Sequence, residues 1–160
     1  MAVRVQSEDF DIAAEMRRLT AGRTDIGAVA TFTGLVRGGP GGGDVAAMTL
    51  EHYPGMTEAE LARVEAEAHD RFPLDGTLII HRVGTLQPGD NIVLVMAASR
   101  HRKAAFEAAE FLMDYLKTRA PFWKKEERAD GSAEWVDARE SDAEAEQRWG
   151  AATGPDGAGR

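Results

Sequence analysis

The chain has 160 residues, of which 43% are hydrophobic and 29% are charged. This balance is typical of a globular protein with one core and excludes an intrinsically disordered chain. No apolar run reaches the roughly 18 residues of a membrane helix, and the first residues show no stretch of signal-peptide length. The net charge of −8, from 27 acidic and 19 basic residues, disfavours a general nucleic-acid binder.

Cysteine is absent, which excludes disulfides, thiolate metal sites and a cysteine nucleophile, and which fits a cytoplasmic protein. The four histidines fall on separate predicted elements and lack the spacing of a metal site. We therefore expect no metal and no cofactor.

The first third of the chain predicts one helix and two strands. Ser7 can cap a helix over residues 7–19, and acidic residues follow it at the positive end of the helix dipole. Residues 26–33 are small and β-branched and predict a strand, and residues 46–53 predict a second strand. The glycine-rich residues 38–44 between them predict a mobile loop.

The middle of the chain predicts a helix followed by a hairpin-like pair of strands. Thr57 and Glu60 have the spacing of a capping box, with a helix continuing to about His69. Residues 77–83 and 91–98 predict strands on either side of a turn at residues 87–90.

The longest predicted helix runs from a cap at Ser99 to about residue 118, where Pro121 prevents continuation. Its expected buried stripe is Phe106, Ala109, Met113 and Leu116.

The remaining segments are predicted as strands over residues 122–126 and 134–138, a helix over 141–149 and a disordered tail over 150–160. Because the strands come in adjacent pairs between helices, the pattern favours an α+β fold with a mainly antiparallel sheet. We expect one domain over residues 1–149.

Basic residues gather at the start of the long predicted helix, at Arg100, His101, Arg102 and Lys103. Cations oppose the positive end of a helix dipole, whereas the free amides there favour an anion. A bound anionic group would make this arrangement favourable; the alternative is that the bases are solvated or paired with acids.

A second cluster places Lys117 and Lys124 on either side of Pro121, with aromatic residues between them. A lysine beside apolar walls or other cations can have a lowered pKa and act as a general acid or base. The alternative is that Lys117 only complements the helix dipole and that Lys124 and Lys125 are ordinary exposed residues. Arg37, next to the glycine-rich loop, is a third candidate, although that loop lacks the ending of a phosphate-binding P-loop.

A distance argument links these clusters. His101 and Lys117 are sixteen residues apart, or roughly 24 Å along a continuous helix. One small ligand cannot contact both within one chain, so there are either two sites or one site built across a subunit interface.

Six segments carry a resemblance when they are taken together and in order. They are TFTGLVR at 31–37, LEHYPGM at 50–56, HRVG at 81–84 with PGD at 88–90, SRHR at 99–102, KTRAPFWK at 117–124 and WVDARE at 135–140. In this combination the chain closely resembles the MoaE family, the large catalytic subunits of molybdopterin synthase, over about residues 10–149.

The resemblance implies an α/β-hammerhead fold and a sulfurtransferase of molybdenum cofactor biosynthesis. The family converts cyclic pyranopterin monophosphate (precursor Z) to molybdopterin by installing a dithiolene. The sulfur arrives as a thiocarboxylate on the C-terminal glycine of a small ubiquitin-like partner, MoaD. The assembly is a heterotetramer with a central dimer of large subunits.

The resemblance also assigns roles to residues. Lys117 is the first choice for the catalytic residue and Lys124 for its helper. The implied substrate-binding residues are Leu35, Val36, Arg37, His101, Arg102, Lys117, Lys124, Lys125, Glu126 and Arg139.

Two other functions remain open from the sequence. A binding module could hold a phosphate or nucleotide at the basic helix start, and it would need Arg37, His101 and Arg102 but no lysine. Alternatively, the chain could be a relative that has kept the fold but not the reaction. The presence of both Lys117 and Lys124 argues against this, because no structural role obviously requires the two lysines.

Overall fold

Two four-stranded sheets and three helices make up the computed structural model, which describes residues 1–38, 45–136, 147, 149 and 150. The helices are α1 (Ile12–Thr20), α2 (Met56–Arg71) and α3 (Arg102–Arg119). The strands are β1 (Ala2–Gln6), β2 (Ala28–Leu35), β3 (Val45–His52), β4 (Gly76–Arg82), β5 (Gly84–Leu86), β6 (Asn91–Ser99), β7 (Phe122–Arg128) and β8 (Ala133–Val136).

The strand order is β1-β4-β6-β2 in the first sheet and β5-β3-β7-β8 in the second. Strands β1 and β4 run parallel, and the other pairings in the described part of the chain are antiparallel. The predicted α+β fold with a mainly antiparallel sheet is therefore confirmed.

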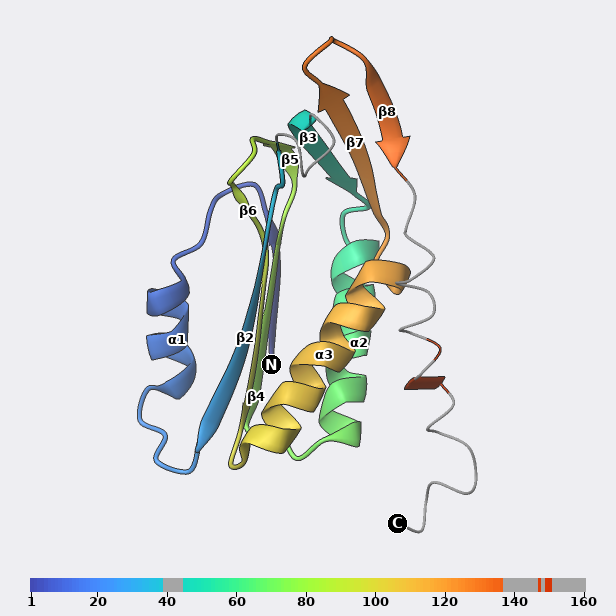
Figure 1. Cartoon of the computed structure of the whole chain (residues 1–160). Helices are drawn as coiled ribbons and strands as arrows, with labels where there is room; N and C mark the ends of the chain where they lie inside the picture. Colours follow the sequence, from blue (N-terminus) through green and yellow to red (C-terminus); the bar gives the residue numbers. More distant parts are fainter. Residues whose placement is uncertain (39–44, 137–146, 148, 151–160) are drawn as a thin grey trace.

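The helices cover the first sheet on both faces: α1 lies on one face, and α2 and α3 lie on the other (Figure 1). Strands β4 and β6 are buried along almost their whole length because both faces are covered. Alternate residues supply the two cores: Ile79 packs with α2 and α3, whereas Leu78 and Ile80 pack with Phe10 on the α1 side. None of the helices in the described residues is long and apolar enough to cross a membrane.

The N-terminal prediction is wrong in two respects. Residues 2–6 form β1 beside β4, an element that the sequence analysis did not predict. Helix α1 begins at Ile12 rather than Ser7, because the Asp11 carboxylate accepts a hydrogen bond from the Ala14 amide (3.0 Å). The Ser7 carbonyl instead accepts hydrogen bonds from the Arg82 guanidinium.

The predicted capping box at Thr57 and Glu60 is also wrong. Helix α2 begins at Met56, and the Glu58 carboxylate accepts a hydrogen bond from the Gly55 amide (2.6 Å). Thr57 is fully buried, and its hydroxyl donates to the Pro121 carbonyl (3.1 Å). Thr57 therefore ties the start of α2 to the chain that leaves α3.

Helix α3 begins two residues later than predicted. Ser99 is the last residue of β6 and its hydroxyl donates to the Pro73 carbonyl (2.7 Å), whereas His101 occupies the cap position. The predicted stripe is also wrong at Phe106, which is 65% exposed. The face that packs on the sheet is rotated by one residue, and its buried members are Ala105, Ala108, Phe111, Leu112, Tyr115 and Leu116.

The later strand predictions are confirmed. Strands β4 and β6 form the expected antiparallel pair, and the short β5 between them joins the second sheet. Strands β7 and β8 pair across a turn in which Gly131 has a φ of +87°. The predicted loop at 39–44, the end of the strand at 137–138, most of the helix over 141–149 and the tail at 151–160 lie outside the described residues.

Gly27 fixes the contact between the start of β2 and the residues that precede α3. Its amide donates to the Ser99 carbonyl (3.0 Å), and a Cβ atom placed on it would lie 2.1 Å from the Arg100 carbonyl oxygen. The chain can approach this closely only without a side chain. Gly27 thereby helps to set the position of His101 at the start of α3.

We predict that Gly27→Ala lowers the free energy of unfolding by about 2–3 kcal/mol, because a backbone carbonyl cannot move away from the new methyl group. Gly34→Ala is the matched control, since its Cβ would lie 2.8 Å from the movable Val93 side chain and should cost about 1 kcal/mol. Urea unfolding followed by tryptophan fluorescence measures the free energy of unfolding of both variants. An equal decrease in the two variants would contradict the prediction.

Candidate active site

Lys117 and Lys124 lie on the two sides of the bend between α3 and β7. Lys117 is exposed in the last turn of α3, and Lys124 is the third residue of β7. Pro121 separates the two elements because it cannot continue the helix. The Lys124 ammonium lies 3.9 Å from the Glu126 carboxylate. The structure thus holds the two lysines at one end of the molecule, on elements joined by a two-residue turn.

The second sheet separates Lys124 from Lys125. Lys124 pairs with Leu50 of β3, whereas Lys125 pairs with Thr49 of β3 and with Trp135 of β8. Because successive side chains of a strand point to opposite faces, Lys124 and Glu126 share one face and Lys125 lies on the other. Of these predicted substrate-binding residues, the structure brings Lys124 and Glu126 together and places Lys125 apart.

A buried histidine packs beneath this bend. The His81 ring of β4 stacks on the Phe122 ring with their centroids 3.8 Å apart, and Phe122 begins β7. His81 Nδ1 lies 2.8 Å from the Arg82 carbonyl, so this nitrogen carries the proton and donates. His81 is a functional candidate to which the sequence analysis assigned no role.

The surroundings of His81 keep its imidazole neutral. Burial is the main reason that the pKa of His81 falls from 6.5 to about 4, and the charges of Lys117 and His52 act in the same direction. A neutral imidazole and an aromatic ring therefore pack at the start of β7, the strand that carries Lys124.

This pKa predicts a loss of stability in acid. The unfolded chain binds a proton on His81 below pH 6.5 and the folded chain only below about pH 4, so the free energy of unfolding falls as the pH drops between these values. The contribution amounts to about 3 kcal/mol. His81→Phe keeps a ring against Phe122 and should flatten the acid dependence relative to the unmodified chain, measured by urea unfolding at pH 7 and pH 4.5. Parallel pH curves for the two proteins would contradict this.

His101 and Arg102 lie at the opposite end of the molecule from the lysines. Both are exposed at the start of α3, and that helix is continuous from Arg102 to Arg119 (Figure 1). His101 and Lys117 are therefore roughly 24 Å apart along the helix axis. Within one chain the structure does not bring the predicted anion-binding and catalytic residues together.

Arg37 lies at the lysine end. It follows β2, whose first residue pairs with Ser99 and whose last pairs with Asn91, so the eight-residue strand separates Arg37 from His101 by roughly 25 Å. Val36 is buried in a small core with Met48, Leu50 and Leu86, and Leu35 is 52% exposed. Arg139 lies outside the described residues.

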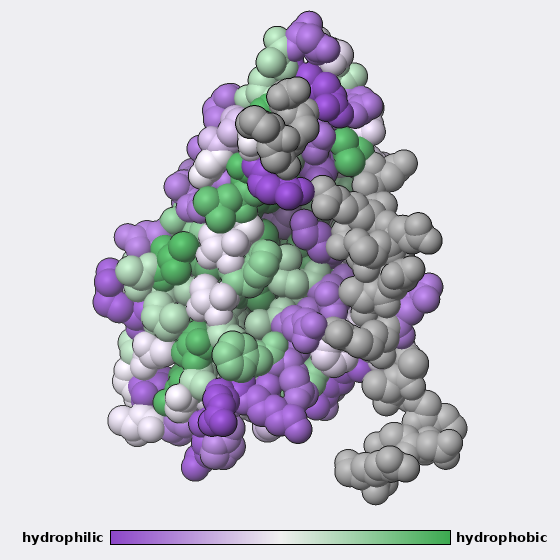
Figure 2. All heavy atoms as spheres, viewed as in Figure 1, coloured by the Kyte–Doolittle hydropathy of each residue, from purple (hydrophilic) through white to green (hydrophobic). Residues whose placement is uncertain are grey.

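An apolar face lies between the two ends. Phe32 and Leu35 of β2 and Phe106 of α3 are 41%, 52% and 65% exposed. Strand β2 is an outer strand of the first sheet, and hydrophobic residues gather on the face of the molecule shown in Figure 2. We call these three residues the β2–α3 face.

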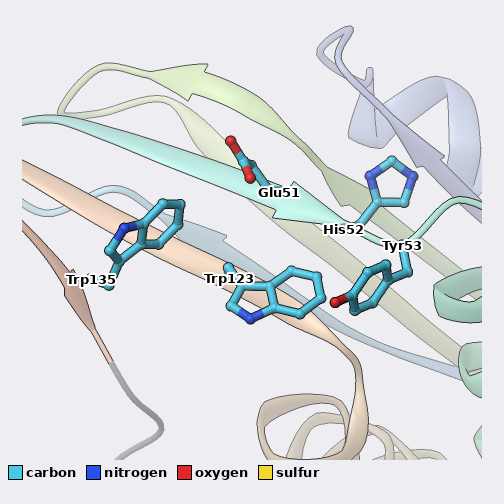
Figure 3. Close-up of a pocket in the computed structure, with 5 residues that line it drawn as sticks. All are labelled: Glu51, His52, Tyr53, Trp123 and Trp135. Carbon is cyan, nitrogen blue, oxygen red and sulfur yellow. The ribbon is translucent and has the colours of Figure 1, made fainter.

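A recess opens on the second sheet, on the face opposite Lys124. It has a volume of about 300 Å³ and is lined by Glu51, His52, Tyr53, Trp123 and Trp135 (Figure 3). The Tyr53 and Trp123 rings meet edge to face with their centroids 4.2 Å apart. The sequence analysis did not propose these residues. The available signal was the pair of tryptophans on two successive predicted strands, and only the β7–β8 register shows that they share a face. No group of three His, Asp or Glu side chains in the described residues could hold a metal ion.

Comparison with known proteins identifies the family. The MoaE protein family model matches residues 5–119. The chain belongs to the MoaE family. The chain is 61% identical over 148 residues to the molybdopterin synthase catalytic subunit of Mesorhizobium japonicum, which covers 92% of each chain. It is 54% identical over 145 residues to that of Escherichia coli, which covers 91% of this chain and 95% of the relative.

Solved structures of the MoaE family have the same fold. The molybdopterin biosynthesis MoaE protein of Burkholderia ambifaria superposes with a TM-score of 0.79 at 53% identity and covers 94% of this chain and 99% of that one. Molybdopterin synthase of Staphylococcus aureus superposes with a TM-score of 0.76 at 34% identity, over 83% of this chain and 95% of that one. The family and fold expected from the six segments are confirmed. The roles of individual residues stay predictions.

Proposed function

We propose that this chain is the catalytic subunit of a molybdopterin synthase. The observation that carries the proposal is its 61% identity, over 92% of both chains, to a relative named molybdopterin synthase catalytic subunit. The reaction converts cyclic pyranopterin monophosphate to molybdopterin by adding two sulfur atoms. A small ubiquitin-like subunit of the MoaD type delivers each sulfur as a thiocarboxylate on its C-terminal glycine.

The predicted site residues form two groups with different tasks in this reaction. Arg37, His101 and Arg102 provide the positive charge that the cyclic phosphate requires. Lys117 is the first choice for the group that moves a proton as each carbon–sulfur bond forms, and Lys124 is its helper. The positions of the two lysines support this assignment, because Lys117 lies in the last turn of α3 and a two-residue turn joins that helix to β7, which carries Lys124.

A symmetric dimer through the β2–α3 face would complete the site. A two-fold axis perpendicular to α3 reverses the direction of the helix in the second copy. His101 and Arg102 of one protomer then approach the end that carries Lys117 and Lys124 of its partner. The exposed Phe32, Leu35 and Phe106 supply the apolar surface that such an interface needs. With one small subunit bound to each protomer, the assembly is a heterotetramer, and the absence of cysteine suits a cytoplasmic location.

Reconstitution tests the enzyme assignment. The chain, a thiocarboxylated MoaD-type subunit and the cyclic pyranopterin should yield molybdopterin, detected by fluorescence after oxidation. We expect Lys117→Ala to reduce the rate by at least about 100-fold, because the loss of a general acid or base has this magnitude. Arg63→Ala on α2 is the control, since it removes an exposed cation far along the sequence from the site.

Lack of product from the unmodified chain, despite a folded complex with the small subunit, would instead favour the binding module. In that case Lys117 would be dispensable, whereas Arg37, His101 and Arg102 would still hold the anion. The same set of variants therefore separates an enzyme from a binding protein.

Subunit complementation tests the shared site. We predict that His101→Ala and Lys117→Ala are each inactive alone, and that dimers mixed from the two variants recover activity. A mixed dimer has one site with both defects and one site with neither, so random mixing should restore about a quarter of the unmodified rate. Recovery no greater than the sum of the two variants would show that each site is built from a single chain.

A further inference from the structure

The outer face of the second sheet carries a cluster of large side chains that the proposed reaction does not use. Strand pairing sets Glu51 of β3 opposite Trp123 of β7, and Lys125 of β7 opposite Trp135 of β8. Because directly paired residues of antiparallel strands share a face, these side chains all lie opposite Lys124. Tyr53 continues the same row, and its ring meets that of Trp123.

These aromatic rings are unusually exposed. Trp135 is 56% exposed, Tyr53 is 51% and Trp123 is 38%. Tryptophan and tyrosine are the residues most enriched at the centres of protein–protein interfaces, where they bury large areas at a small cost in side-chain entropy. Rings grouped around a recess of about 300 Å³ indicate that a partner inserts a side chain there.

The chemistry of the lining selects a positively charged group. The faces of tryptophan and tyrosine rings attract cations, and the Glu51 carboxylate borders the same recess (Figure 3). In the part of the chain that the structure describes, the Glu51 carboxylate takes part in no ion pair, including none with Lys125 on the same face. An anionic group would meet both the carboxylate and the negative ring faces, and a neutral apolar group would leave the carboxylate without a partner.

We propose that this recess receives an arginine or lysine side chain of the small sulfur-delivering subunit. The inference rests on the proposed function, and its location supports it. Trp123 directly precedes Lys124 in β7, so a subunit anchored at the recess lies on the other face of the strand that carries the candidate helper lysine. An anchor on the outer face leaves the opposite face, with Lys124, open to the sulfur-carrying tail.

Steady-state kinetics with the small subunit as the varied substrate test the docking role. Trp135→Ala and Glu51→Gln should each raise KM for the small subunit by about tenfold and leave kcat unchanged, because a docking residue affects encounter and not chemistry. Glu8→Gln, which alters an exposed carboxylate near the N-terminus, is the control and should change neither constant. The melting temperatures of all three variants should match that of the unmodified chain.

Binding of small probes tests the charge preference. N-acetyl-arginine amide should quench tryptophan fluorescence in a saturable way at millimolar concentration, whereas its neutral isostere N-acetyl-citrulline amide should not. Glu51→Gln should weaken the binding of the arginine probe severalfold. Equal binding of the two probes, or an effect of Trp135→Ala without one of Glu51→Gln, would show an apolar docking site and overturn the proposal.

Three other outcomes separate a failure of the docking proposal from a failure of the proposed function. Unchanged KM in both variants would overturn the proposal while leaving the synthase assignment intact. A change in the oligomeric state of the chain alone in Trp135→Ala would assign the recess to a second copy and also overturn it. Failure of the unmodified chain to make product would contradict the proposed function, whereas titration with the carboxylate form of the small subunit would still measure docking.

Discussion

The packing of α3 across the first sheet is the constraint on which the rest of the molecule depends. Ala105 and Ala108 are buried, and their small side chains let the first half of the helix approach the sheet closely. Phe111, Leu112 and Tyr115 fill the larger space beneath the second half. A helix held along its whole length cannot bend to bring its ends together, so His101 and Lys117 stay roughly 24 Å apart. If His101 and Lys117 contact the same substrate, as proposed, a second protomer must supply one of them.

The chain that leaves the C-terminal end of α3 is also fixed by contacts with other elements. The carbonyl of Pro121 accepts the buried hydroxyl of Thr57 at the start of α2, and the Phe122 ring stacks on His81 of β4. Three elements therefore meet at the two-residue turn between the lysines. The same contacts that stabilise the fold fix the relative positions of Lys117 and Lys124. A buried imidazole that must stay neutral links the acid stability of the protein to the geometry of its candidate active site.

Sequence patterns predicted the elements better than their ends. The strands at β2, β3, β4, β6 and β7 were found because β-branched and apolar runs are local signals. The starts of α1, α2 and α3 were placed wrongly because several residues could have capped each helix, and tertiary contacts chose among them. Ser99 and Thr57 have good capping side chains, but the Pro73 and Pro121 carbonyls occupy their hydroxyls. Phe106 resembled a core residue because one turn of a helix cannot reveal which side will meet the sheet.

The sequence also predicted some features of the candidate site and missed others. Lys117 and Lys124 stood out from their spacing around Pro121, and the distance argument from His101 needed only the length of a helix. The neighbours of Lys124 and Lys125 could not be predicted. They depend on the register of β7 against β3 and β8, which the sequence alone does not reveal. His81 was overlooked because its partners Phe122 and Lys117 are distant in the sequence.

Strand alternation in β7 separates two tasks that a synthase of this kind must perform. Phe122, Lys124 and Glu126 share the face that borders the core with Leu50, whereas Trp123 and Lys125 share the outer face with Trp135. One short strand thus presents the candidate helper lysine on one side and the proposed docking surface on the other. A carrier protein that docks on the outer face would not compete with the pyranopterin for the inner one. Under the proposed function two sulfur atoms are needed and each carrier delivers one, so a spent carrier would be exchanged for a loaded one at the outer face without displacing the substrate from the inner face.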